Sequence, residues 1–276
     1  MFPAYLLSLR EGLEAALIIG ILLGALQKIH RRDLIPSLWW GAALATGLSL
    51  LLGILLPAFG LSLEGTPETL FEGITMFLAA TILTWMIFWM SHQARTLRQS
   101  LEGDVQRAAV QNGQRGIFAL AFLAIFREGT ELALFLTASI FASDALQVSI
   151  GALLGLGTAI LLGWSIFAST TRLDLRRFFQ VTSMLLLLFA AGLIAHGVHE
   201  FNEIGWIPPI IEHVWDINPW LDENSILGSL LKALFGYNGN PSLSEVLAYL
   251  VYLLGIFAWM RRENKRMRPL PEAETA

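Results

Sequence analysis

Long apolar stretches separated by short polar segments make up most of the chain. A hydrocarbon core about 30 Å thick is crossed by a helix of about 20 mostly apolar residues. Runs of that length lie near 3–28, 37–60, 67–91, 116–141, 148–169, 178–200 and 243–260. The pattern therefore predicts an all-α membrane protein with seven transmembrane helices. Tryptophans near the ends of these runs fit the interfacial position of aromatic anchors; they are Trp39, Trp40, Trp85, Trp89 and Trp259.

Basic residues gather on alternate connections between these runs. Of the 18 Lys and Arg residues, 15 lie in the first, third and fifth connections and in the tail, whereas the second and fourth connections hold none. Connections rich in Lys and Arg stay in the cytoplasm. We therefore expect a multi-pass protein of the bilayer with its N-terminus outside and its C-terminus inside.

The composition excludes several other classes of protein. Of the 276 residues, 55% are hydrophobic and 14% are charged, against about 25% charged in an ordinary globular domain. This excludes a disordered chain and a conventional nucleic-acid binder, so no nucleic-acid partner is expected. The absence of cysteine excludes a disulfide scaffold, thiolate metal ligands and thiol catalysis.

A charged five-residue motif occurs twice. Arg10-Glu11-Gly12-Leu13-Glu14 returns 117 residues later as Arg127-Glu128-Gly129-Thr130-Glu131. The first and fourth runs cross the bilayer in opposite directions, so helices 1–3 and 4–6 are predicted to form an inverted repeat, with the seventh helix added. Transporters built in this way hold their substrate near the midplane, at the interface of the repeats.

The repeat divides the chain into six segments. These are a first three-helix repeat at 1–92, a cytoplasmic linker at 93–115, a second repeat at 116–200, a periplasmic loop at 201–242 with a short amphipathic helix at 223–235, the seventh helix at 243–260, and a cytoplasmic tail at 261–276.

Charged side chains inside a membrane span are costly, at roughly 2.5–3.5 kcal/mol each, and mark functional sites. Within each motif the two Glu share a helix face, and the Arg lies four residues before the second Glu, where it can pair with it. If all six groups are ionised, two surplus negative charges remain, which one divalent cation would neutralise. The predicted metal ligands are Glu11, Glu14, Glu128 and Glu131, with Arg10 and Arg127 as supporting charges.

A second polar group, which we call the outer rim, lies at the outer ends of the third and sixth runs. It consists of Glu68, Glu72, His196, His199, Glu200 and Glu203. Mixed imidazole and carboxylate ligands suit first-row ions such as iron or manganese, and an acidic surface concentrates cations. The alternative is that acidic residues here only complement a helix dipole.

Two R-E-G-x-E motifs at matched places in seven spans resemble the oxidase-dependent iron transporter family, over residues 1–260. The resemblance implies uptake of Fe²⁺, with Fe³⁺ left open, through the bacterial inner membrane. It implies that the Glu residues of both motifs are required for transport. It also implies iron as the transported ion without a permanently bound cofactor, and a periplasmic iron-binding protein and a haem peroxidase as partners.

Two other classes remain open at this point. Four Glu on two helices could hold a pair of metals in a membrane di-iron carboxylate oxidoreductase. Alternatively, the motifs could be buried Arg–Glu bridges that hold helices in register in a structural or sensory membrane protein.

Overall fold

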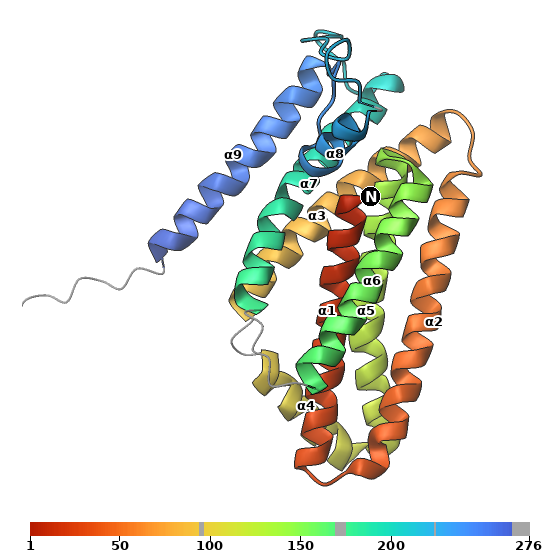
Figure 1. The fold of residues 1–276 in the computed structure, drawn as a ribbon, viewed down its shortest axis with the longest axis vertical. Coiled ribbons are helices and arrows are strands. Elements are labelled where there is room, and N and C mark those ends of the chain that lie inside the picture. Colours follow the sequence, from red (N-terminus) through yellow and green to blue (C-terminus); the bar gives the residue numbers. More distant parts are fainter. Residues whose placement is uncertain (94–96, 169–174, 224, 267–276) are drawn as a thin grey trace, which may run out of the picture.

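The computed structural model describes residues 1–93, 97–168, 175–223 and 225–266, which are almost entirely helical (Figure 1). Parts of the predicted linker (94–96) and tail (267–276) lie outside the described residues, as does residue 169 at the end of the fifth run. The α-helices are α1 Phe2–Lys28, α2 Ile35–Gly60, α3 Thr66–Gln93, α4 Leu97–Gln111, α5 Gly113–Ala142, α6 Ala145–Ala168, α7 Leu175–Glu203, α8 Ile226–Phe235 and α9 Leu243–Arg266.

Local sequence signals account for several helix ends. Proline stands in the first turn of α1 and of α2, where its missing N–H costs nothing. The Ser225 hydroxyl caps α8 by accepting a hydrogen bond from the Gly228 N–H at 3.0 Å. Gly236 ends α8 with a φ of 65°, a conformation that favours glycine. A short helix thus forms within the range 223–235 expected from the sequence.

Five helical segments are long and apolar enough to cross a membrane. They are Arg32–Gly60, Thr66–Met90, Ala145–Ile166, Arg177–Glu203 and Leu243–Arg262. Helices α1 and α5, of 27 and 30 residues, are as long but carry the charged motifs. Large apolar side chains on the outer faces of α2, α6 and α9 are exposed, as expected for surfaces that contact lipid.

The long helices pack in pairs. Helix α1 packs along α6, α2 along α5, and α3 along α7. In α2 and α6 the contact faces are lined by small residues four apart, which allow the backbones to approach closely. These residues are Gly41, Ala45, Ser49 and Gly53 in α2, and Gly151, Gly155, Ala159 and Gly163 in α6.

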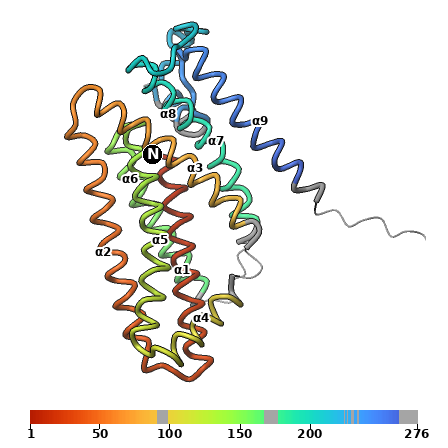
Figure 2. Tube along the Cα trace, turned by 180° about the vertical axis from the view of Figure 1, so that it is seen from behind, coloured from red at the N-terminus to blue at the C-terminus, as the bar shows by residue number. Residues whose placement is uncertain are grey.

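The opposite ends of the bundle carry different structures. Helix α4 lies against α1 and α5 at the end that holds the first connection, and it buries Val105 and Ala109 there (Figure 2). The predicted linker 93–115 is therefore mostly a helix; Leu97, Leu101, Val105 and Ala109, spaced four apart, were its signal in the sequence. The other end of the bundle carries the loop that follows α7, together with the short helix α8. Helix α9 starts at that end and inclines away from the bundle.

Candidate metal site

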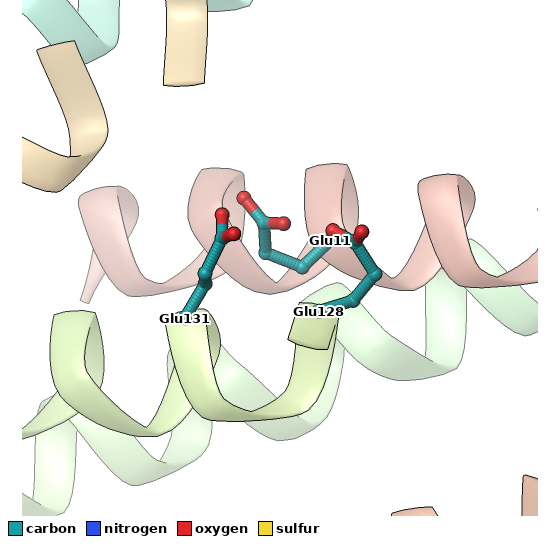
Figure 3. Close-up of side chains that lie close together, drawn as sticks. All are labelled: Glu11, Glu128 and Glu131. Carbon is teal, nitrogen blue, oxygen red and sulfur yellow. The ribbon is translucent and has the colours of Figure 1, made fainter. Parts of the chain in front are cut away.

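Three carboxyl groups from the two motifs meet inside the bundle. Glu11 of α1 and Glu128 and Glu131 of α5 point toward one another from neighbouring helices (Figure 3). One carboxylate oxygen from each lies within 4.8 Å of the other two, and all three residues are largely buried. Within the ranges that the structure describes, this is the one group of three His or carboxylate residues close enough to share a metal ion.

These carboxylates have free oxygen atoms. Both oxygens of Glu11, Oε2 of Glu128 and Oε2 of Glu131 are buried without a hydrogen-bond partner among the described residues. Buried polar atoms are almost always paired, because leaving them unpaired costs a large part of their hydration free energy. Unpaired oxygens that converge on one point are the donor set that a bound cation would satisfy.

The two arginines each pair with the second Glu of their motif. Arg10 Nε donates to Glu14 Oε1 at 3.0 Å, and Arg127 Nε donates to Glu131 Oε1 at 3.0 Å. Among the described residues, Glu11 and Glu128 form no ion pair. The surplus of two negative charges expected from the sequence therefore falls on these two side chains, which face each other across the contact between α1 and α5.

The fourth predicted ligand, Glu14, is not part of the group within 4.8 Å, although it lies near enough to Glu11 and Glu128 for electrostatic repulsion between the carboxylates. Its carboxylate is bound to Arg10, which is 99% buried and extends to Ser183 Oγ and Met90 Sδ, both at 3.5 Å. Arg10 thereby connects α1 to α3 and α7. The structure thus brings together Glu11, Glu128 and Glu131, and assigns Glu14 to a buried ion pair beside them.

The motif glycines set how closely the helices approach. A Cβ atom at Gly12 would lie 2.6 Å from the Cβ of Ala159 on α6. A Cβ atom at Gly129 would overlap the side chain of Ser49 on α2. In both motifs the glycine therefore serves helix packing, and Glu11 of the first motif is left facing Glu128 and Glu131 of the second.

The size of the group suits a single metal ion. Carboxylate oxygens bind first-row divalent cations at about 2.0–2.2 Å, so ligands on opposite sides of an ion lie about 4.0–4.4 Å apart. The 4.8 Å upper limit of the group exceeds this span by about 0.4–0.8 Å. Small side-chain rotations would bring all three oxygens to bonding distance.

The outer rim does not gather in the same way. Glu200 lies close enough to Glu72, Glu203 and Glu68 for electrostatic repulsion between the carboxylates. Within the described ranges, however, no three rim side chains bring their ligand atoms within 4.8 Å of one another. The rim is thus an acidic surface rather than a compact set of ligands.

The two histidines of the rim have other partners. His199 Nδ1 lies 3.0 Å from Glu245 Oε1, and its Nε2 lies 3.6 Å from Glu203 Oε1. His196 Nδ1 lies 3.2 Å from the Gly192 carbonyl oxygen. Its ring lines a cavity of about 20 Å³ that Lys232 also lines, and this basic side chain disfavours a cation there.

Glu245 was missed in the sequence. It is 98% buried, and besides His199 it accepts hydrogen bonds from the Ser242 N–H at 3.2 Å and from Asn238 Nδ2 at 2.7 Å. The Ser242 hydroxyl in turn accepts from the Glu245 N–H at 3.3 Å. The sequence Ser-Leu-Ser-Glu before an apolar run is the pattern of a capping box, and this pattern could have identified Glu245 from the sequence. Through His199 this capping box ties α9 to α7.

Comparison with known proteins identifies the family of the chain. Residues 1–261 match the iron permease FTR1 family. The chain is 37% identical over 256 residues to the ferrous iron permease EfeU of Escherichia coli O157:H7 and to that of Shigella sonnei, covering 92% of this chain and 93% of each relative. It is 36% identical to the ferrous iron permease EfeU of Yersinia pestis, covering 92% of this chain and 91% of the relative. No solved structure matches the chain. The chain therefore belongs to the iron permease FTR1 family, and so is a transporter rather than an enzyme.

Proposed function

We propose that this chain takes up Fe²⁺ across the bacterial inner membrane through a carboxylate site between α1 and α5. The observation that carries the proposal is the group of Glu11, Glu128 and Glu131, whose oxygens converge without hydrogen-bond partners in the described part of the chain. Iron would exchange its hydration shell for these oxygens, and its two positive charges would offset the surplus on Glu11 and Glu128.

In this proposal α1 and α5 also cross the membrane, which gives seven spans with the N-terminus outside and the C-terminus inside. The pairing of helices supports an inverted repeat. Under that repeat α1 corresponds to α5 and α2 to α6, so the packing of α1 on α6 is the counterpart of the packing of α5 on α2. The contacts of Gly12 with Ala159 and of Gly129 with Ser49 are counterparts in the same sense.

The same pairing suggests which bodies move during transport. Small residues join α1 tightly to α6 and α2 tightly to α5, whereas Glu11 and the two Glu of α5 meet at the seam between these pairs. Each pair combines one helix from each repeat. Motion of one pair against the other would separate the ligands and release the ion, while the packing within each pair persists.

The charged neighbours have distinct roles in the proposal. The Arg10–Glu14 and Arg127–Glu131 pairs limit the negative charge of the empty site, and so limit how tightly it retains iron. The outer rim raises the local concentration of cations before they reach the site. The periplasmic iron-binding protein and the haem peroxidase implied by the resemblance remain predicted partners.

Uptake of radioactive Fe²⁺ into proteoliposomes tests the proposal, with wild type compared with Glu128→Gln. Removing one partner from a buried charge interaction costs about 3–5 kcal/mol, so iron affinity is expected to fall by about 100-fold or more. Asp104→Asn is the matched control, because Asp104 pairs with Arg107 on the surface of α4. Competition by Fe³⁺, Mn²⁺ and Zn²⁺ measures selectivity. Equal uptake by Glu128→Gln and the control would refute the site.

A further inference from the structure

We propose that Trp89 is a positioning residue for the iron site: its ring holds the Arg127 guanidinium so that Glu131 keeps one carboxylate oxygen free for the ion. The inference rests on the proposed function and deepens it. It concerns a side chain that neither motif contains and that the sequence alone indicates only as an interfacial anchor.

The geometry places Arg127 on an aromatic surface formed by α3. The guanidinium carbon lies 4.5 Å from the centre of the Trp89 ring and 6.0 Å from that of Trp85. The two tryptophan rings are themselves stacked, with their centres 6.1 Å apart. A guanidinium within about 6 Å of an indole is attracted to the face of the ring. Trp89 therefore provides the main contact and Trp85 supports it.

Among the described residues, Arg127 and Glu131 are joined by a single hydrogen bond. Arg127 Nε donates to Glu131 Oε1 at 3.0 Å, while Glu131 Oε2 is buried without a partner among the described residues. Arginine and carboxylate frequently form two parallel hydrogen bonds, which would engage both oxygens. Here the indole face holds the guanidinium, and Oε2 stays available to the group with Glu11 and Glu128.

The first motif uses a different device. Arg10 is 99% buried and is fixed by polar contacts with Ser183 and Met90 as well as by Glu14. The Arg127 side chain is 38% exposed and carries the aromatic contact instead. Arg127 therefore has more freedom to reorient than Arg10, and its partner Glu131, unlike Glu14, belongs to the site. Control of Arg127 by Trp89 is thus control of a metal ligand.

Without the ring, the guanidinium is free to turn and bind both oxygens of Glu131. Iron then competes with an intramolecular cation for one of its ligands, so its affinity falls while the remaining ligands are unchanged. From the usual strength of such aromatic contacts, Trp89→Leu is expected to raise the KM for Fe²⁺ about 3- to 30-fold. The maximal rate is expected to change much less.

The test measures initial Fe²⁺ uptake into proteoliposomes over a range of concentrations. Trp89→Leu is compared with Trp89→Phe, which keeps an aromatic face and is expected to restore a KM near that of wild type. Trp164→Leu is the matched control, because Trp164 on α6 is 71% exposed. Equal KM values for Trp89→Leu and Trp164→Leu would overturn the inference. If Trp89→Leu is not recovered folded, Trp89→Met is measured in its place against the same criterion.

A double-variant cycle separates positioning from general damage. Binding of Fe²⁺ to purified protein is measured for Trp89→Leu, Arg127→Gln and the combined variant, so that the result does not depend on transport. Because Trp89 acts through Arg127, adding Trp89→Leu to Arg127→Gln is expected to change the affinity less than twofold. A further loss equal to that in the wild-type background would refute the mechanism. Absence of saturable uptake by wild type would instead refute the proposed function.

Discussion

The two Glu residues of the first motif offer a direct test of the charge assignment. Glu11 and Glu14 lie one turn apart on α1 and are both largely buried. Glu14 is bound to Arg10, whereas Glu11 has no ion-pair partner in the described part of the chain and faces Glu128. The same substitution, Glu→Gln, should therefore change the stability of the metal-free protein in opposite directions at these two positions.

The expected magnitudes follow from the distances. The carboxylate oxygens of Glu11 and Glu128 lie within 4.8 Å of each other, and two charges at that limiting distance repel by about 3.5 kcal/mol at an effective dielectric constant of about 20. Glu11→Gln removes this repulsion and is expected to raise the free energy of unfolding by up to about that amount. Glu14→Gln leaves the guanidinium of Arg10 buried without its counter-charge, and is expected to lower the free energy of unfolding by about 3–5 kcal/mol.

Thermal unfolding of the purified protein in detergent, with a chelator and then with Fe²⁺, measures both effects. Glu11→Gln is expected to unfold at or above the wild-type temperature with chelator, and to gain little on addition of Fe²⁺, because a ligand is lost. Glu14→Gln is expected to unfold well below wild type. If Glu11→Gln lowers the unfolding temperature as much as Glu14→Gln does, the acids act as structural bridges and the reasoning fails.

Three further predictions concern helix packing and capping. Gly129→Leu is expected to abolish folded protein, because the new side chain would overlap α2. Gly157→Leu on α6 is expected to be tolerated, since no described atom lies within 4 Å of a Cβ there. The yield of monodisperse protein compares the two variants. The double variant Gly53→Cys, Ala133→Cys, whose Cβ atoms would lie 3.8 Å apart, is expected to form a disulfide in this cysteine-free chain. Its uptake rate is expected to stay unchanged, because α2 and α5 move together. Loss of uptake that reductant reverses would contradict a rigid pairing of α2 with α5. Glu245→Gln is expected to lower the free energy of unfolding by about 1–3 kcal/mol without changing the KM for Fe²⁺, as measured by thermal unfolding and uptake.

Much of the fold follows from local pattern. The apolar runs at 3–28 and 37–60 correspond closely to α1 at Phe2–Lys28 and α2 at Ile35–Gly60, because a run of about 20 mostly apolar residues favours one continuous helix. The Arg–Glu pairs within the motifs also follow from the sequence, because residues four apart on a helix are neighbours whatever surrounds them. Helix α4 was missed, since its single narrow apolar stripe is a weak signal beside the long runs.

Which acids meet is a tertiary property. Helical periodicity places Glu11 and Glu14 on one face of α1, but it does not say which of them reaches α5. It also does not say how far α1 is shifted along α5. The rotation and the shift of each helix depend on how it packs against its neighbours. Close contacts of the motif glycines with other helices set them, Gly12 on Ala159 of α6 and Gly129 on Ser49 of α2.

The sequence by itself therefore determined the number of surplus charges and the helices that carry them. Only the tertiary structure decided that the surplus falls on Glu11 and Glu128, that Glu14 belongs to Arg10, and that Arg127 rests on Trp89. The physical reason is that charge and hydropathy add along a chain, whereas the meeting of side chains from distant segments depends on the packing of every surface between them.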